Sequence, residues 1–141
     1  MRRYKIIIQY DGSFFSGWQL QKDKKTVQGE IENALKIITN SKERIAIKGS
    51  GRTDAGVHAI GQVAHFDIDT SLKKEELKNA INYYISNHCK IMSISLVDNN
   101  FDSRYDAIKR TYIYQLYTGS SILYSNQAWL VNNVDIRTLN L

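Results

Sequence analysis

The chain has 141 residues, of which 43% are hydrophobic and 23% charged, proportions that are ordinary for one globular domain. This composition excludes a mainly disordered, collagen-like or coiled-coil protein. Nineteen Lys and Arg against 14 Asp and Glu leave a net charge of +5, a mild field that would assist binding of a polyanion. The single cysteine, Cys89, is expected to pack in the core, and no apolar stretch approaches the roughly 18 residues of a membrane helix. We therefore expect a cytoplasmic protein.

The predicted elements of the first 100 residues follow the order strand, helix, strand, strand, helix, strand. Alternating apolar residues predict the strands, and apolar residues spaced three and four apart predict the helices. The strands are expected at 4–10, 44–48, 62–68 and 91–97, and the helices after Thr26 and after Thr70 or Ser71. Met92, Ile94 and Leu96 are expected to face inward. This order predicts an α+β fold of the ferredoxin-like βαββαβ type, an antiparallel sheet with two helices on one face.

The pattern changes near residue 100. An aromatic strand is expected at 109–117, a second strand at 127–131, and the first turns of a helix from Val134. We therefore divide the chain into a ferredoxin-like domain, residues 1–100, and the beginning of a second, incomplete α+β domain, residues 101–141.

The segment from Gly49 to Ala59 contains the strongest candidate site. Its sequence GSGRTDAGVHA has three glycines within eight residues, which permit unusual backbone dihedrals and close approach of a ligand. It has neither a dinucleotide fingerprint nor the Gly-Lys-Ser/Thr of a P-loop. Asp54 lies two residues from Arg52, and a nearby guanidinium favours an ionised carboxylate. Such an aspartate could act in covalent catalysis; a tight turn with a structural Asp–Arg pair is the alternative.

Other residues that could carry chemistry have simpler structural interpretations. Asp67 and Asp69 end a strand as Asp-x-Asp, but the element order does not provide the parallel sheet of aspartyl phosphatases, so we expect both to face solvent. The three histidines lack a metal-ligand spacing. We expect them to be structural or surface residues: His58, His65 and His88.

The aromatic strand near the C-terminus has two interpretations. Tyr112 and Tyr114 would share one face of a strand, and such a pair commonly belongs to a core. Lys109 and Arg110 precede it, and aromatic residues interleaved with cations are typical of surfaces on which nucleic-acid bases stack. The sequence pattern leaves both interpretations open.

Several short motifs, taken together, resemble one enzyme family. They are Tyr10-Asp11-Gly12, Gly17-Trp18-Gln19 with Gln21, Thr26-Val27-Gln28, the run from Gly51 to Ala59, Phe101-Asp102-Ser103-Arg104 and the run from Lys109 to Tyr114. In this order they are similar to the motifs of tRNA pseudouridine synthase A. The resemblance extends from Tyr4 to about Tyr117, and the run around Asp54 is its most specific part.

This resemblance implies an isomerase, an intramolecular transferase that converts uridine to pseudouridine at positions 38 to 40 of the tRNA anticodon arm. Asp54 matches the family's nucleophilic aspartate, and Arg52 matches the arginine that pairs with it and helps to displace the target base. Tyr112 matches the tyrosine whose ring packs against the uracil. The resemblance further implies tRNA as the partner, a homodimer in the full-length protein, and no metal or redox cofactor.

The chain departs from the family pattern in two places. The family's Phe-His-Ala-Arg-Phe segment reads Phe-Asp-Ser-Arg-Tyr at 101–105, so the contact made through that histidine is not expected here. Family members continue past Leu141 with a stretch that completes the catalytic domain, so we expect a fragment whose isolated activity the sequence leaves open. A non-catalytic RNA-binding module and an inactive remnant are the alternatives, although residues 62–68 lack the signature of an RNA-recognition motif.

Overall fold

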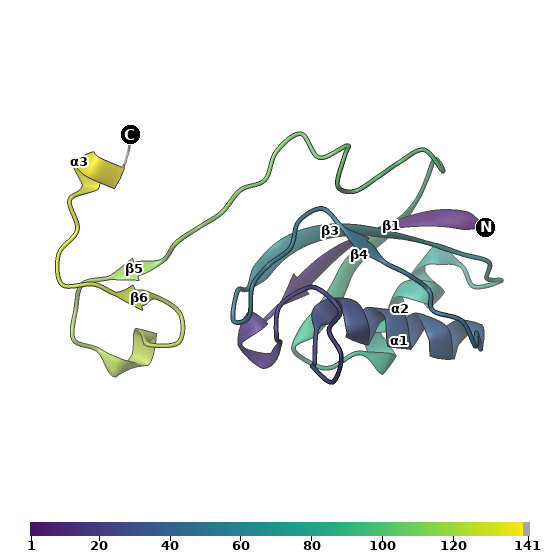
Figure 1. The fold of residues 1–141 in the computed structure, drawn as a ribbon, viewed down its shortest axis with the longest axis horizontal. Coiled ribbons are helices and arrows are strands. Elements are labelled where there is room, and N and C mark those ends of the chain that lie inside the picture. The colour runs from purple at the N-terminus through teal and green to yellow at the C-terminus, as the bar shows by residue number, and fades with distance from the viewer. Residues whose placement is uncertain (140–141) are drawn as a thin grey trace. The chain divides into compact units, whose positions relative to one another are not determined.

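The computed structural model describes residues 1–139, which form two compact units, Met1–Ile108 and a second that begins at Lys109. The first unit holds one four-stranded sheet and two helices (Figure 1). Its strands are β1 (Arg2–Tyr10), β2 (Lys48–Gly49), β3 (Ala59–Ile68) and β4 (Cys89–Val97), its helices are α1 (Val27–Thr39) and α2 (Lys74–Tyr84), and a short 3-10 turn, η1, spans Gly12–Phe14. The unit includes residues 101–108, and the domain division near residue 100 stays a prediction.

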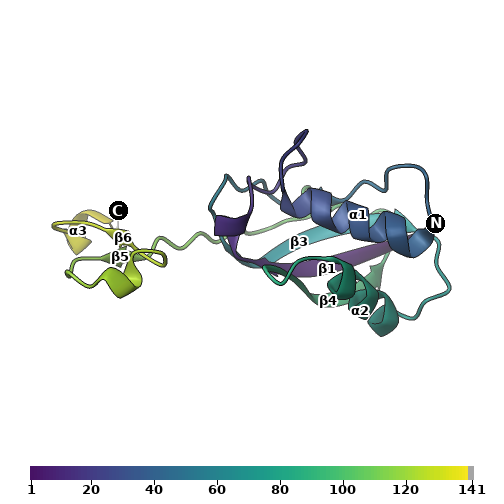
Figure 2. The same cartoon turned by 90° about the horizontal axis from the view of Figure 1, so that it is seen from below.

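The sheet has the strand order β2-β3-β1-β4, and every neighbouring pair is antiparallel. Helices α1 and α2 lie across the same face of this sheet (Figures 1 and 2). This arrangement confirms the ferredoxin-like α+β fold, in which the central strands are first and third along the chain. The opposite face of the sheet carries no helix of this unit.

The core lies between the sheet and its two helices. Alternate residues of β1 point into it, and they are almost completely buried: Tyr4, Ile6, Ile8 and Tyr10. The apolar stripe of α1 meets them, with Val27, Ile31, Ala34 and Leu35 at 0% exposure. The alternation of apolar residues in β1 and their spacing of three and four in α1 therefore predict side chains of the same core.

Helix α1 begins where the sequence predicts. The Thr26 hydroxyl accepts a hydrogen bond from Gly29 N at 3.1 Å, as an N-cap does. Helix α2 corrects the prediction of a cap at Thr70 or Ser71. It begins at Lys74 after Lys73, whose backbone N–H donates to the Glu76 carboxylate at 2.7 Å. Thr70 instead closes a short turn by accepting from Leu72 N.

The second strand is much shorter than predicted. Of residues 44–48 only Lys48 is in β2, because the Ile47 N–H donates to the Glu32 carboxylate at 3.0 Å rather than to a neighbouring strand. Glu32, on α1, is 4% exposed and also accepts from Arg44 Nε at 2.7 Å. A buried carboxylate on the helix thus takes the backbone group that a longer strand would use.

The inward side of β4 also differs from the prediction, at Met92 and at Leu96. Ile7 pairs with Ser93 and Ile8 with Ile91, so Met92 is an extra residue in the ladder. Such a bulge reverses which alternate residues face the core. Met92 is accordingly 46% exposed. Ile94 is buried as expected, and Leu96 pairs with Tyr4 but is 45% exposed.

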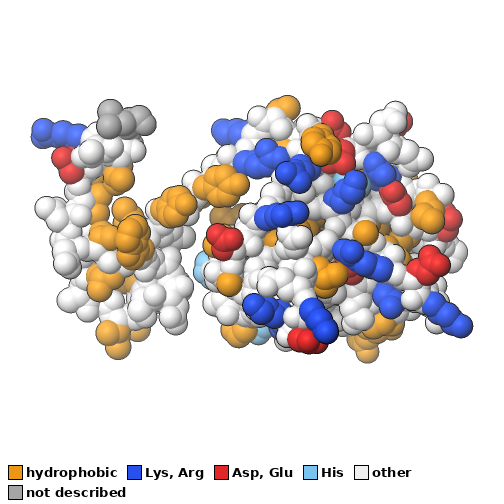
Figure 3. Space-filling view, in the orientation of Figure 1, with side chains coloured by type: hydrophobic (Ala, Val, Ile, Leu, Met, Phe, Trp, Pro, Cys, Tyr) orange, Lys and Arg blue, Asp and Glu red, His pale blue; other side chains and the backbone are white. Residues whose placement is uncertain are grey.

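The second unit has short elements. Strands β5 (Leu116–Tyr117) and β6 (Trp129–Leu130) pair in parallel, with the 3-10 turn η2 (Ile122–Tyr124) between them and α3 (Ile136–Leu139) after them. The predicted strands at 109–117 and 127–131 therefore shrink to two residues each. None of residues 109–139 is buried, and hydrophobic side chains stand at the surface of this unit (Figure 3). No helix in the described part of the chain is long and apolar enough to cross a bilayer.

Candidate active site

The glycine-rich segment forms a loop between β2 and β3, residues 50–58, which we call the Asp loop. Its first residues continue the contacts of the sheet. Ser50 N donates to Val63 O at 2.7 Å. The buried amide of Gln62 accepts from Ser50 Oγ at 2.7 Å and donates to Gly51 O at 2.6 Å. The loop therefore leaves the sheet from a fixed starting point.

Thr53 anchors the middle of the Asp loop to the core. Its Oγ1 lies 2.7 Å from the Tyr10 hydroxyl, and its carbonyl accepts from Trp18 N at 3.0 Å. Tyr10 and Trp18 are each 3% exposed. Burial raises the pKa of the Tyr10 phenol, so this hydroxyl stays protonated at neutral pH. The residue that precedes Asp54 is thus held from two sides by core residues.

The C-terminal end of the Asp loop is hydrogen-bonded to Gly12 of η1, and we call these hydrogen bonds the clasp. Gly56 N donates to Gly12 O at 3.1 Å, and Gly12 N donates to His58 Nδ1 at 3.0 Å. A Cβ on Gly12 would lie 1.9 Å from Val57 O, so only glycine allows this approach. Val57 N also donates to Asp54 O at 3.2 Å, which closes a turn with Gly56 at a φ of 84°. A positive φ at the third residue is typical of a type II turn.

Asp54 opens this turn, and its side chain is exposed, as is that of Arg52. Among the ion pairs within residues 1–139, none joins Arg52 to Asp54. The tight turn is therefore present, whereas the Arg52–Asp54 ion pair, on which both the functional and the structural interpretation drew, is not formed in this part of the chain. The backbone on both sides of Asp54 is held in place while its carboxylate remains open to a ligand. Tyr112 lies in the second unit and is 65% exposed.

Asp11 lies beside the clasp between η1 and the Asp loop. Its carboxylate accepts from Ser13 Oγ at 2.6 Å and from Ser13 N at 3.1 Å, and it lies 3.0 Å from His58 Nδ1. These Ser13 hydrogen bonds are the main cause of the lowered pKa of Asp11, and the charges of His58 and His88 add to it. The Asp11 carboxylate is therefore ionised at neutral pH.

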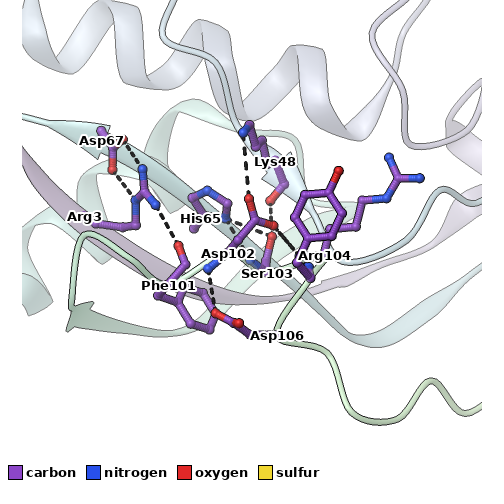
Figure 4. A network of polar contacts seen from close by, with 10 residues as sticks. Arg3, Lys48, His65, Asp67, Phe101, Asp102, Ser103, Arg104 and Asp106 are labelled. Carbon is purple, nitrogen blue, oxygen red and sulfur yellow. Dashed lines mark hydrogen bonds and ion pairs between the residues drawn. The ribbon is translucent and has the colours of Figure 1, made fainter.

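The helix-free face of the sheet carries the segment 101–106, which we call the strap (Figure 4). Arg3 on β1 donates to Phe101 O at 2.7 Å. Ser103, 2% exposed, donates from Oγ to Lys48 O at 2.7 Å and from N to His65 Nδ1 at 3.1 Å. The strap is thus fixed to three strands. His65 is 3% exposed and structural, as expected.

The carboxylates at this face are also engaged. Arg3 donates two hydrogen bonds of 2.7 Å to Asp67, and this pairing lowers the pKa of the Asp67 carboxyl. Asp67 is therefore paired rather than turned freely to solvent. The Asp69 side chain is 76% exposed, as expected, with the Met1 amino group 3.4 Å from its carboxylate. Asp102, which stands at the family's histidine position, accepts from Arg104 N at 2.9 Å and shapes the turn of the strap.

Cys89 packs in the core, as expected, with 5% exposure. Burial raises the pKa of its thiol to about 12, with the Glu30 charge adding to the effect, so the thiol is protonated at neutral pH. Within residues 1–139 no three His, Cys, Asp or Glu side chains are grouped to hold a metal ion.

The residues that hold the Asp loop were not predicted from its own sequence. Tyr10, Gly12 and Trp18 belong to motifs that resemble the family, but their spacing gives no role to any of them. The structure brings all three against the Asp loop, through Thr53, Gly56 and His58. The signal that could have indicated this contact is the joint occurrence of the three motifs in one chain.

Comparison with known proteins identifies the family. The model of the tRNA pseudouridine synthase family matches residues 6–106, which include the Asp loop and the strap. The chain is 47% identical over 121 residues to tRNA pseudouridine synthase A of Maridesulfovibrio salexigens, covering 86% of this chain and 44% of that protein. It is 46% identical over 136 residues to the Ehrlichia chaffeensis protein of the same name, covering 93% and 54%.

A third relative matches over nearly the whole chain. The tRNA pseudouridine synthase A of Neorickettsia sennetsu is 42% identical over 143 aligned residues, covering 99% of this chain and 56% of that protein. The chain thus spans about half the length of the curated relatives it matches. On the strength of the family match and these identities, the chain belongs to the tRNA pseudouridine synthase family.

Proposed function

We propose that this chain carries the catalytic aspartate, Asp54, of an enzyme that isomerises uridine to pseudouridine in the tRNA anticodon arm, at positions 38 to 40. Family membership and the names of the relatives support the reaction and the tRNA substrate. One structural observation carries the choice of residue. Asp54 has an exposed side chain, while the residues around it are bonded to Tyr10, Trp18 and Gly12.

The chemistry requires such a carboxylate. In the isomerisation the C1′–N1 bond of uridine breaks, a C1′–C5 bond forms, the hydrogen on C5 leaves as a proton, and N1 takes up a proton from water. No electrons are gained or lost overall, so the reaction itself calls for no redox group. Asp54 would attack C6 of the uracil, attack C1′ of the ribose, or remove a ribose proton. All three routes use an ionised carboxylate in a fixed position.

The target uridine must first be made accessible. A base in a stem has to leave the stack before its glycosidic bond can be reached, at a cost of roughly a few kcal/mol. Arg52 is exposed two residues from Asp54, and its flat guanidinium can fill the vacated position in the stack. Tyr112, with 65% of its surface exposed, offers a ring against which the flipped base can pack.

The charge of the chain is compatible with this substrate. A net charge of +5 favours association with the polyanionic backbone of tRNA. Because phosphate contacts release counterions, binding should weaken steeply with salt concentration. The proposal also includes a homodimer for the full-length protein, which rests on the family resemblance, and a cytoplasmic location, which the single cysteine favours.

The test is tritium release from tRNA that contains 5-tritiated uridine. Since C5 becomes the glycosidic carbon, every turnover releases its hydrogen to water. We expect release by the parent chain, and none by Asp54→Asn, which keeps the shape of the side chain but lacks the nucleophilic charge. Asp69→Asn is the matched control, because it makes the same chemical change at an exposed carboxylate outside the Asp loop.

Equal loss of release in both variants would contradict the assignment of Asp54. If the parent chain binds tRNA without releasing tritium, the same pair of variants is compared in a protein extended to the length of the relatives. Release by that protein that depends on Asp54 supports the proposal. Absence of release there would instead indicate a non-catalytic RNA-binding module.

A further inference from the structure

Nδ1 of His58 lies within hydrogen-bond distance of both a donor and an acceptor. His58 Nδ1 lies 3.0 Å from Gly12 N, which donates a hydrogen bond to it, and 3.0 Å from the Asp11 carboxylate. To accept from the amide, Nδ1 must carry a lone pair, whereas it needs a proton to donate to the carboxylate. The two contacts therefore belong to two different protonation states at the same atom.

The first state keeps the Asp loop clasped to η1. Gly12 then donates to His58 and accepts from Gly56, so one residue bonds to the third residue of the turn that begins at Asp54 and to the residue that follows the turn. In the second state the Nδ1 proton is drawn to Asp11, and the Gly12 amide loses its acceptor. Gly12 is buried, and a buried amide without a partner costs free energy. The clasp would then rearrange.

We propose that His58 is a positioning residue for Asp54. With Nδ1 unprotonated it closes the clasp on Gly12 and fixes the turn that presents the carboxylate, and with Nδ1 protonated it turns to Asp11 and releases the turn. Its effect on the structure stands alone, while its effect on turnover rests on the proposed function. The arrangement predicts that the Asp loop is held more firmly at neutral pH than at acidic pH.

Two further groups, the Ser13 hydroxyl and His88, lie near His58 and Asp11. Asp11 is the N-cap of η1, and the Ser13 hydroxyl donates at 2.6 Å to the same carboxylate oxygen that lies near His58. His88, which lies before β4, stacks its ring on Phe14 of η1 with 3.4 Å between centroids, and its charge also acts on Asp11. The experiment must therefore separate His58 from His88.

The backbone amide signal of Gly12 reports directly whether Gly12 N donates to His58 Nδ1. In ¹H–¹⁵N spectra of the 141-residue chain recorded across acidic to neutral pH, we expect the Gly12 signal to move with the same midpoint as the His58 imidazole. In His58→Asn the amide oxygen can replace Nδ1 as acceptor but cannot be protonated, so this transition should vanish. His88→Gln should leave it in place.

Three results would overturn the proposal. One is a Gly12 amide that does not respond while His58 titrates, and another is a transition of equal size in His58→Asn. The third is a transition that disappears in His88→Gln, since the nearby His88 would then be its source. None of these results depends on catalysis, so they remain decisive even if the chain shows no turnover.

Turnover tests the consequence for the reaction. We expect His58→Gln, whose amide is displaced from the position of Nδ1, to lower kcat by on the order of tenfold to a hundredfold, as misplaced catalytic groups do. His58→Asn should keep kcat near that of the parent and lack the fall at acidic pH. Loss of kcat in both variants with an unchanged pH profile would contradict the role in positioning. Absence of any Asp54-dependent release would count against the proposed function alone.

Discussion

The two units of this chain place their apolar side chains differently. In the first unit the sheet and its two helices enclose a continuous core, which includes Tyr4, Ile31 and Phe66. In the second unit the large apolar residues are exposed, among them Ile122 at 84% and Trp129 at 69%. Strands of nine and ten residues form in the first unit, beside the two-residue β2, and strands of two residues form in the second.

This difference shows what positions a loop with a function. The Asp loop has little regular structure, yet it is held by Tyr10, Trp18 and Gln62, which are themselves fixed by the core of the first unit. Tyr112, the proposed partner of the flipped base, lies in a unit where none of the described residues is buried. Local patterns predict strands in both units, but only a buried interior makes such strands persist.

The largest expected effect comes from opening a cavity in the first unit. Ile31→Ala removes a side chain of α1 that is 0% exposed, and we expect the free energy of unfolding to fall by about 2–5 kcal/mol. Ile122→Ala makes the same change in the second unit, at a side chain that is 84% exposed, and should cost less than about 0.5 kcal/mol.

Both variants can be measured by urea denaturation, followed by the fluorescence of the buried Trp18 in a background in which Trp129 is replaced by Phe. The comparison between units would fail if Ile122→Ala destabilised the first unit as strongly as Ile31→Ala. That result would mean that the second unit shares the cooperative core of the first.

An intermediate effect is expected at the clasp between η1 and the Asp loop. A Cβ on Gly12 would meet Val57 O at 1.9 Å, and backbone atoms cannot move aside as a flexible side chain can. We expect Gly12→Ala to displace the Asp loop and to lower the free energy of unfolding by about 1–3 kcal/mol. Amide chemical shifts of residues 50–58 would report the displacement.

Gly61→Ala is the matched control for this prediction. It lies in β3, where a Cβ would have Ile7 Cγ2 as its nearest neighbour at 3.7 Å, an ordinary contact. It should leave the signals of the Asp loop in place and leave the stability nearly unchanged. Unchanged loop signals in Gly12→Ala would show that η1 does not position the Asp loop.

The smallest expected effect is a pH dependence that arises where the strap meets the sheet. Burial lowers the pKa of His65, and the positive charges of Arg3 and Lys48 lower it further, against the opposing effects of Asp102 and Asp67. The unfolded chain, with a His pKa of about 6.5, therefore takes up this proton first as the pH falls. The stability contributed by neutral His65 is complete above that value and is lost as the pH falls through the folded-state pKa.

Denaturation at about pH 7.5 and at about pH 5, on either side of the unfolded-state pKa, measures this loss. His65→Asn, whose oxygen can still accept from Ser103 N, should lose less stability over this interval than the parent. The other two histidines are present in both proteins and cancel in the comparison. An equal loss in parent and variant would show that His65 does not couple the strap to pH.

Much of the first unit could be predicted from the sequence because its signals are local. The alternation in β1, the apolar stripe of α1 and the cap at Thr26 each depend on residues a few positions apart, and the structure confirms all three. The run around Asp54 was likewise visible, since its glycines and charged residues are consecutive. The role of Asp54 stays a proposal that experiment must test.

Tertiary structure alone decided the features that depend on distant residues. Glu32 keeps β2 short, because its carboxylate accepts a hydrogen bond from Ile47 N, 15 positions further along the chain. The bulge at Met92 appears only when β4 is paired with β1. The two partners of His58 lie more than 40 positions away from it. Such contacts follow from which backbone groups and side chains meet once the core has formed. A linear pattern determines the elements, whereas packing determines which residues hold the Asp loop.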